Sequence, residues 1–214
     1  MKILHIDAAS GADILPVVRD TLRFLKKNIA VVSTIQHMQK LEAAVKFLNK
    51  NSIKVDIAGQ VLGCRVPSIP KSAEQVLYIG SGKFHPIGIY LKTKKEVIAA
   101  NPLAGSVSKI TSKDVEGLEK RRKGAIAKFL SSDNIGILVS TKLGQSGVQG
   151  GMKRVNEIKK KYKDKNFYMF VFNTLNSSYL DNFPFIECWV NTACPRIFED
   201  FKKGIVNLED IPYE

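Results

Sequence analysis

Short apolar runs alternate along this chain with longer stretches in which apolar side chains recur at helical spacing. Residues 29–34 (IAVVST) form a continuous apolar run rich in β-branched residues, which is typical of a buried strand. Residues 38–51 instead place Leu41, Ala44 and Leu48 on one face of a helix. The same alternation predicts strands at residues 1–6, 29–34, 53–64, 76–80, 96–102, 135–141, 167–175 and 187–194. It predicts helices at residues 14–28, 38–51, 113–131 and 147–163, and short helical turns at 177–183 and 198–205.

The second half of the chain repeats the pattern of the first half. IAVVSTIQ at residues 29–36 matches IGILVSTK at residues 135–142, and two later pairs of motifs keep nearly the same spacing. Two generic strand–helix–strand stretches can share such letters by chance, but the preserved Val-Ser-Thr and the matched spacing favour a true repeat. Because strands separated by helices form parallel sheets, we expect an α/β fold with two repeated four-stranded parallel-sheet βαβ domains, residues 1–93 and residues 94–214.

The composition is that of a globular protein with a strong positive charge. Hydrophobic residues make up 44% and charged residues 25% of the 214 residues, and no apolar run is long enough for a membrane span or a secretory signal. We therefore expect no membrane association and a cytoplasmic location. The net charge of +13 favours acidic or nucleic-acid partners. Two basic clusters, residues 120–123 and 159–165, are interpreted either as solvated helix ends or as a docking surface for an anionic macromolecule.

Three cysteines are candidates for metal ligation, catalysis or core packing. An odd number of cysteines in a chain without a secretory signal argues against a disulfide framework. Cys64 and Cys194 each end a predicted strand, at the edge where parallel sheets bind ligands. Their spacing matches no zinc or ferredoxin pattern, and two thiolates do not complete a tetrahedral site, so ligation and packing both stay open for them. Cys188 begins a strand beside Trp189, a position typical of a buried core thiol.

A glycine-rich loop, GSGKFHP, follows a predicted strand. It begins with Gly80, Ser81 and Gly82 and contains His85, while His37 follows another predicted strand. Free backbone N–H groups and a lysine suit such a loop to bind carboxylate or phosphate, but it lacks the third glycine of the dinucleotide fingerprint and the GK[ST] of a P-loop. The alternative is a tight turn with no ligand. No histidine has the spacing of a metalloprotease or a catalytic triad.

Taken in order, these loops resemble the archaeal diphthamide synthases. The motifs that carry the resemblance are VVSTIQHMQKL, GQVLGC, VLYIGSGKFHPIG, ILVSTKLGQ and WVNTACPRI, and the resemblance covers residues 1–200 of the chain. It implies three similar α/β domains, each of which gives one cysteine to a single 4Fe–4S cluster. Cys64 matches the ligand of the family's middle domain and Cys194 that of its last domain, while Cys188 matches no ligand.

The resemblance also implies a reaction. The family transfers the 3-amino-3-carboxypropyl group of S-adenosylmethionine, as a radical, to a histidine of elongation factor 2, which is the first step of diphthamide biosynthesis, and releases methylthioadenosine. We therefore expect a transferase that depends on a 4Fe–4S cluster and uses S-adenosylmethionine as co-substrate. The residues expected to bind the co-substrate are Gly80, Ser81, Gly82 and His85, with Gln60 of the GQVLGC motif. No catalytic residue is expected beyond the cluster.

One departure from the family pattern changes this expectation. The match begins at the family's middle domain, so the first domain and its cysteine have no counterpart in the sequence. We expect a separate first-domain protein to supply the third cluster cysteine, in a hetero-oligomer or a homodimer. The alternatives are a non-catalytic subunit that binds elongation factor 2 or supports electron delivery and, without the resemblance, a general nucleotide-binding α/β module. Nucleic-acid binding rests on net charge alone.

Overall fold

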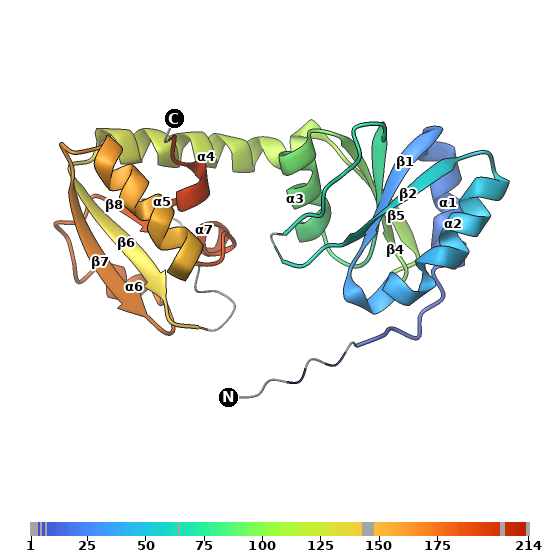
Figure 1. Ribbon diagram of the computed structural model, residues 1–214, viewed down its shortest axis with the longest axis horizontal. Helices are drawn as coiled ribbons and strands as arrows, with labels where there is room; N and C mark the ends of the chain where they lie inside the picture. The colour runs from blue at the N-terminus through green and yellow to red at the C-terminus, as the bar shows by residue number, and fades with distance from the viewer. Residues whose placement is uncertain are drawn as a thin grey trace. The chain divides into compact units, whose positions relative to one another are not determined.

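The chain folds into two compact units, each built around its own sheet (Figure 1). Met1–Val115 form the first unit and Glu116–Glu214 the second. The computed structural model describes residues 4, 6, 8–63, 65–142, 148–201 and 204–212, with the backbone alone for residues 148–150. The strand predicted at residues 1–6 therefore falls largely outside the described residues.

A five-stranded sheet forms the centre of the first unit. Its strands are β1 Asn28–Ser33, β2 Lys54–Gln60, β3 Gln75–Ile79, β4 Glu96–Asn101 and β5 Ser106–Ile110, in the spatial order β2-β1-β3-β4-β5. The first four strands run parallel, and β5 returns antiparallel to β4. Strands inside a parallel sheet are covered on both faces. Consistent with this, β3 is buried along its whole length and β1 is exposed only at its first residue.

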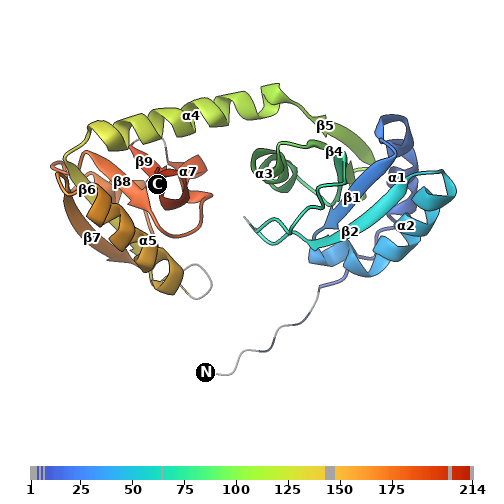
Figure 2. The same ribbon diagram turned by 45° about the horizontal axis from the view of Figure 1, so that its top comes forward.

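Helices cover both faces of this sheet (Figure 2). They are α1 Leu15–Thr21, α2 Leu41–Lys50 and α3 Phe84–Thr93, with the 3-10 helices η1 Leu22–Phe24 and η2 Ile35–Lys40. α1 and α2 pack against Val31 and Leu77 on one face, and α3 packs against Val76 and Tyr78 on the other. Because successive strand residues point to opposite faces, the neighbours Leu77 and Tyr78 enter different cores.

A four-stranded, fully parallel sheet forms the centre of the second unit, in the order β7-β6-β8-β9. Its strands are β6 Asn134–Ser140, β7 Asn166–Phe172, β8 Cys188–Asn191 and β9 Ile205–Asn207. The helices are α5 Val148–Lys161, α6 Ser177–Leu180 and α7 Ile197–Asp200, with η3 Leu208–Asp210, and α4 Ser112–Ser131, whose residues 112–115 belong to the first unit. Phe129 of α4 and Val155 of α5 share one core with Cys188. Trp189 and Phe198 share the core on the opposite face.

Several basic side chains stabilise the second unit through hydrogen bonds and an ion pair between its own segments. The Arg121 guanidinium donates to the Phe198 carbonyl at 2.9 Å, and Arg122 forms an ion pair with Asp210. The Lys165 ammonium is buried and donates to two carbonyls at the C-terminal end of α4, at 2.9 and 2.7 Å. Helix carbonyls at this end have no partner within the helix, so the lysine stabilises it. Arg121, Arg122 and Lys165 therefore stabilise the fold itself. Neither interpretation of the basic clusters, as solvated helix ends or as a docking surface, describes these three residues.

The α/β class and the repeat predicted from the sequence are confirmed. The two VST-containing motifs lie at the ends of β1 and β6, each the second strand of its sheet, and both sheets place the neighbouring strands in the same order, β2-β1-β3-β4 and β7-β6-β8-β9. Only the first sheet adds a fifth, antiparallel strand. Within the described part of the chain, no helix is both long enough and apolar enough to cross a membrane.

The structure divides the chain at a different place from the predicted boundary at residues 93 and 94. The sequence pattern places residues 96–110 in the second domain, but β4 pairs in parallel with β3, with Gln75 opposite Glu96, and β5 pairs with β4. The first unit therefore extends to Val115. The fourth strand of the second sheet is β9. It overlaps the helical turn predicted at residues 198–205 at Ile205 alone, and the sequence pattern predicts no element for its other two residues.

Candidate functional site

Three strand ends of the first sheet meet at one edge. β2, β1 and β3 are parallel neighbours, so their last residues, Gln60, Ser33 and Ile79, lie side by side. The buried Ser33 hydroxyl donates to the Ile79 carbonyl at 2.8 Å, and the Val61 N–H donates to the Ser33 carbonyl at 2.8 Å. Open α/β sheets bind ligands beyond this edge. The structure thus brings two predicted site residues to one place: Gln60, and Gly80, which follows Ile79.

The GSGKFHP loop turns from β3 directly into α3. A Cβ atom added at Gly80 would lie 2.5 Å from Tyr78 Oη, so only glycine fits there without displacing the ring. Gly82 has a φ of +74°, a left-handed conformation that glycine favours. Both glycines of the loop are therefore required, Gly80 by the Tyr78 ring and Gly82 by its backbone conformation. α3 begins at Phe84, and the positive end of its dipole at this N-terminus suits a carboxylate or another anion.

A buried tyrosine lies beneath this loop and orders it. The Tyr78 hydroxyl donates to the Ser81 carbonyl at 3.1 Å and lies 3.3 Å from His85 Nδ1. Burial raises the pKa of Tyr78 to about 12, so the hydroxyl stays protonated. The hydroxyl has a single hydrogen, which it donates to Ser81. Its contact with His85 is therefore a hydrogen bond only when His85 Nδ1 donates to the hydroxyl oxygen. Tyr78 therefore favours the His85 tautomer that is protonated at Nδ1. Sequence patterns missed this residue because it resembles any apolar strand position.

The segment after β2 carries the two other predicted residues of the first unit. Gln60 is half-buried and follows a β-bulge at which Gly59 has a φ of +116°. Just beyond it, Leu62 and Arg65 exchange two backbone hydrogen bonds of 3.1 and 2.9 Å. Cys64 lies outside the described residues, so its role as a ligand stays a prediction.

In the second unit, the loop after β8 presents Cys194. The Asn191 side-chain amide donates to the Cys194 carbonyl at 2.9 Å and to Asn207 Oδ1 at 2.8 Å, and its oxygen accepts the Ala193 N–H at 3.0 Å. The Thr192 hydroxyl adds a bond of 2.8 Å to a carbonyl of β6. Cys194 itself is half-buried. The loop thus fixes the backbone of this cysteine and leaves the residue partly exposed.

Cys188 is a core thiol, as its place at the start of a strand predicted. It has no exposed surface and belongs to the core that includes Phe129 and Val190. Burial raises the pKa of its thiol to about 12. A metal ligand has to be a thiolate, so Cys188 is unsuited to ligation.

The two described cysteines should therefore react very differently with thiol reagents. In native protein treated with iodoacetamide at mild alkaline pH, we expect Cys194 to be alkylated and Cys188 to be protected until the chain is unfolded. The higher pKa alone makes the Cys188 thiolate roughly a thousandfold scarcer than that of an ordinary cysteine, and burial excludes the reagent as well. Peptide mass mapping measures the sites. A Cys188→Ala chain should show an unchanged Cys194 rate, and equal labelling of both thiols would contradict the assignment.

His37, predicted to lie near the ligand edge, is buried in η2 and is only 3% exposed. Its Nδ1 atom is buried without a hydrogen-bond partner among the described residues. Burial, with a smaller effect of the Lys40 charge, lowers the pKa of His37 below 6.5. Because it is buried, His37 is a neutral residue inside the fold. Its lowered pKa makes the stability of the chain depend on pH.

This burial should make the chain less stable just below neutral pH. The folded state binds the His37 proton more weakly than the unfolded state, so its contribution to stability is present above pH 6.5 and is lost as pH falls below it. For one proton the free energy of unfolding changes by at most about 1.4 kcal/mol per pH unit. Urea unfolding at pH 7.5 and 5.5 measures the loss. The loss of unfolding free energy between the two pH values should be smaller in a His37→Phe chain. An equal loss in both chains would contradict the prediction.

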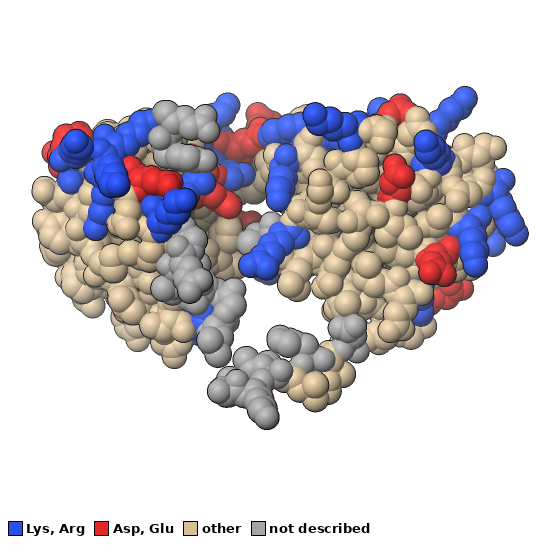
Figure 3. Space-filling model, in the orientation of Figure 1, with Lys and Arg blue, Asp and Glu red and all other residues tan. Residues whose placement is uncertain are grey.

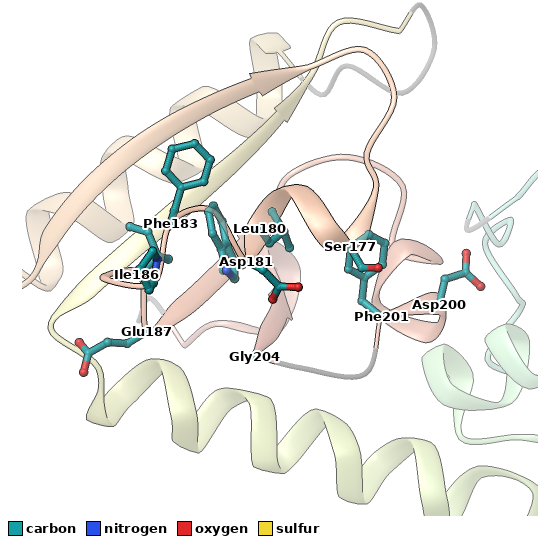
Figure 4. A pocket seen from close by; sticks show the side chains of 11 residues that line it. Ser177, Leu180, Asp181, Phe183, Ile186, Glu187, Asp200, Phe201 and Gly204 are labelled. Carbon is teal, nitrogen blue, oxygen red and sulfur yellow. The ribbon is translucent and has the colours of Figure 1, made fainter.

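A separate cavity of about 620 Å³ lies in the second unit (Figure 4). Trp189, Phe183 and Phe201 contribute aromatic surface to it, and Asp181 and Asp200 contribute carboxylates. None of the residues predicted for the site lines this cavity. In the part of the chain that the structure describes, no three His, Cys, Asp or Glu side chains are grouped to bind a metal ion.

The family of the chain follows from comparison with known sequences. The model of the family described as "Putative diphthamide synthesis protein" matches residues 1–210, nearly the whole sequence. The chain belongs to the diphthamide synthesis family. The resemblance seen in the sequence motifs is thereby confirmed.

Relatives in this family carry the name 2-(3-amino-3-carboxypropyl)histidine synthase. The protein from Pyrococcus horikoshii is 32% identical over 206 residues, which is 91% of this chain and 58% of that protein. The protein from Methanocaldococcus jannaschii is 33% identical over 193 residues, 86% of this chain and 51% of that protein. Subunit 1 of the synthase from Bos taurus is 30% identical over 203 residues, 87% of this chain and 43% of that protein. The chain thus spans about half the length of these relatives.

The fold agrees with a solved member of the family. The crystal structure of Dph2 from Pyrococcus horikoshii with a 4Fe–4S cluster superposes with a TM-score of 0.82 at 30% sequence identity, covering 94% of this chain and 62% of that one. The two units of this chain therefore have the arrangement of strands found in a family member that binds an iron–sulfur cluster.

Proposed function

We propose that this chain takes part in the transfer of the 3-amino-3-carboxypropyl group of S-adenosylmethionine to a histidine of elongation factor 2, the first step of diphthamide biosynthesis. The observation that carries the proposal is the Cys194 loop. It presents a half-buried thiol at the end of β8, fixed by Asn191, in a family whose Pyrococcus horikoshii member was crystallised with a 4Fe–4S cluster. The reaction would take place in the cytoplasm, where the elongation factor works.

Cys194 and Cys64 are the proposed cluster ligands. Iron–sulfur clusters are bound by accessible thiolates, and the partly exposed Cys194 fits that need, whereas the fully buried Cys188 does not. Cys64 is assigned by its motif, GQVLGC. Because the sequence has three cysteines and one of them is in the core, the third thiolate has to come from outside these 214 residues. We propose that a first-domain protein supplies it, in a hetero-oligomer or a homodimer.

The GSGKFHP loop is the proposed site for the methionine part of the co-substrate. Gly80 and Gly82 let the backbone turn tightly into α3, whose N-terminal end favours a carboxylate. Ser81 and His85 are held by Tyr78 beneath the loop. Gln60 offers a side-chain amide at the same sheet edge. A bound 4Fe–4S cluster would supply the electron that breaks the bond between sulfur and the aminocarboxypropyl carbon, with methylthioadenosine as the other product.

A second candidate function is a non-catalytic subunit of such an enzyme. The names of relatives from animals, such as subunit 1 from Bos taurus, indicate a synthase built from more than one subunit. A subunit of this kind would bind elongation factor 2 or support electron delivery without completing the cluster. It would still need the same fold but not the accessible thiols.

Anaerobic reconstitution with iron and sulfide tests the proposal. The chain is loaded alone and together with a candidate first-domain protein, and iron content and the low-temperature EPR spectrum are recorded after reduction. We expect a 4Fe–4S signal that needs the partner, and release of methylthioadenosine when S-adenosylmethionine and elongation factor 2 are added. If neither preparation binds iron, the catalytic proposal fails, and binding of elongation factor 2 without iron would favour the non-catalytic subunit.

A further inference from the structure

The cavity of the second unit has no role in the proposed reaction. Its volume of about 620 Å³ is typical of pockets that hold small molecules, which measure about 300–1,000 Å³. Its walls come from α6 and the segment that follows it, from Trp189 of β8, and from Asp200, Phe201 and Gly204 (Figure 4). Neither Cys194 nor any residue of the GSGKFHP loop lines it. It is therefore a site separate from the one already described.

The wall of this cavity offers apolar and aromatic surface. Trp189 lies in the core of the sheet and is 6% exposed, and the Phe183 ring packs edge-to-face on it at 6.3 Å between the ring centroids. Leu180 and Ile186 add aliphatic surface. Aromatic rings bury apolar groups and also attract cations over their faces. The wall thus suits the apolar part of a ligand, and it suits a positive charge better than a negative one.

Among the described residues that line the cavity, every charged side chain is a carboxylate. The fold already uses the Glu187 carboxylate, because it accepts the N–H groups of Asp133 and Asn134 at 2.7 and 2.9 Å. The carboxylates of Asp181 and Asp200 differ. In the part of the chain that the structure describes, they form neither a hydrogen bond nor an ion pair. Two negative groups are therefore left for a ligand.

The acidic groups lie beside the apolar surface. Figure 4 shows the Asp181 carboxylate between Ile186 and Phe201, with Asp200 beyond Phe201. The Arg121 guanidinium comes near this end of the cavity, but it donates to the Phe201 carbonyl at 3.0 Å. Figure 3 shows Lys and Arg side chains over the helices of this unit, and the net charge of the chain is +13. The cavity thus differs in charge from the surface around it.

We propose that this cavity binds an organic cation, which is an ammonium or guanidinium group on an apolar stem. The aromatic and aliphatic wall takes the stem, Asp181 pairs with the cation, and Asp200 adds a second negative charge. An anionic ligand would meet both carboxylates and be repelled. The cation is either a free amine or a lysine or arginine side chain of another protein, because both present the same group. This inference goes beyond the proposed reaction and does not depend on a bound cluster.

Fluorescence of the full chain tests this binding site. The chain has one tryptophan, Trp189, and it lines the cavity, so its emission reports binding there. The chain is titrated with phenethylammonium and, separately, with 2-phenylethanol, which has nearly the same shape without the charge. We expect a saturable change with the cation and a dissociation constant about tenfold higher for the neutral alcohol.

Three variants assign the charge. Asp181→Asn should weaken binding of phenethylammonium about threefold, and Asp181→Asn together with Asp200→Asn about tenfold. Asp164→Asn is the matched control, because Asp164 is an exposed aspartate of the same unit that does not line the cavity, and it should leave the dissociation constant unchanged. Unfolding curves verify that each variant stays folded.

A blocked tripeptide, acetyl-leucyl-arginyl-leucinamide, distinguishes the two sources of the cation. Tighter binding of the peptide than of phenethylammonium would indicate a side chain of another protein, and weaker or equal binding a free amine. The absence of a saturable change with both cations overturns the proposal. So does an alcohol that binds as tightly as the cation, an Asp181→Asn chain that binds like the wild type, or an Asp164→Asn chain that is weakened to the same extent.

Discussion

Replacing Cys194 by alanine is expected to remove the iron–sulfur centre from the reconstituted protein, whereas the same change at Cys188 should leave it in place. A cluster bound by one thiolate from each of three domains cannot spare a ligand, and Cys194 is the partly exposed cysteine of the second unit. Iron and sulfide per chain, together with the EPR signal, measure the result in the presence of the first-domain protein.

The Cys188→Ala chain is the matched control for this experiment. Like the change at Cys194, it removes one cysteine thiol, but a buried one. It should lower the free energy of unfolding because it leaves a small cavity, and it should leave the iron content unchanged. A Cys194→Ala chain that binds as much iron as the wild type would exclude Cys194 as a ligand. Loss of iron in both variants would point to a general defect of folding, which unfolding curves of the two chains would reveal.

Replacing Gly80 by valine is expected to weaken the binding of S-adenosylmethionine by about tenfold or more, because a misplaced loop costs at least about 1.4 kcal/mol. Its Cβ would lie 2.5 Å from Tyr78 Oη and 2.7 Å from Cζ, so the tyrosine ring or the loop has to move. Either movement breaks the contacts of Tyr78 with Ser81 and His85. Equilibrium binding of S-adenosylmethionine to the reconstituted complex measures the effect.

Two further glycines separate the loop's role from general destabilisation. Gly82→Val meets no neighbouring atom but forces a φ of +74° on a branched residue, so it should also weaken binding. Gly88→Ala, within α3, meets no atom within 4 Å and should bind normally. If the Gly80 and Gly82 variants bind S-adenosylmethionine as the wild type does, the loop is not its site.

Local patterns predict the strands well but not how they associate. The apolar run of residues 96–102 correctly indicates a strand, yet its assignment to the second domain is wrong because pairing with β3 is a contact between distant segments. β9 has three residues and is too short to show a period. The repeat is unaffected by this error because it depends on β1 and β6, whose motifs share Val-Ser-Thr and which are each the second strand of their sheet.

The candidate site shows the same limit. The place of Cys188 at the start of a strand predicts its core position, but the place of Cys194 after the strand's end left ligation and packing both open. The residues that support the site cannot be recognised from local patterns, because Tyr78 and Asn191 act through loops that fold back onto them. Arg121 resembles a surface charge for the same reason, since its carbonyl partner lies 77 positions further along the chain.

The pairing of Asn191 with Asn207 has a consequence for how the family varies. Both side chains are buried, and the Asn191 amide uses both hydrogens, one on Asn207 and one on the Cys194 carbonyl. A leucine at either position would leave a buried polar group unpaired, at a cost of about 1–3 kcal/mol. In aligned relatives, the two positions should therefore change together, and independent variation would contradict the coupling. If the two positions change together, the short final strand β9 is under the same selection as the cysteine motif it supports.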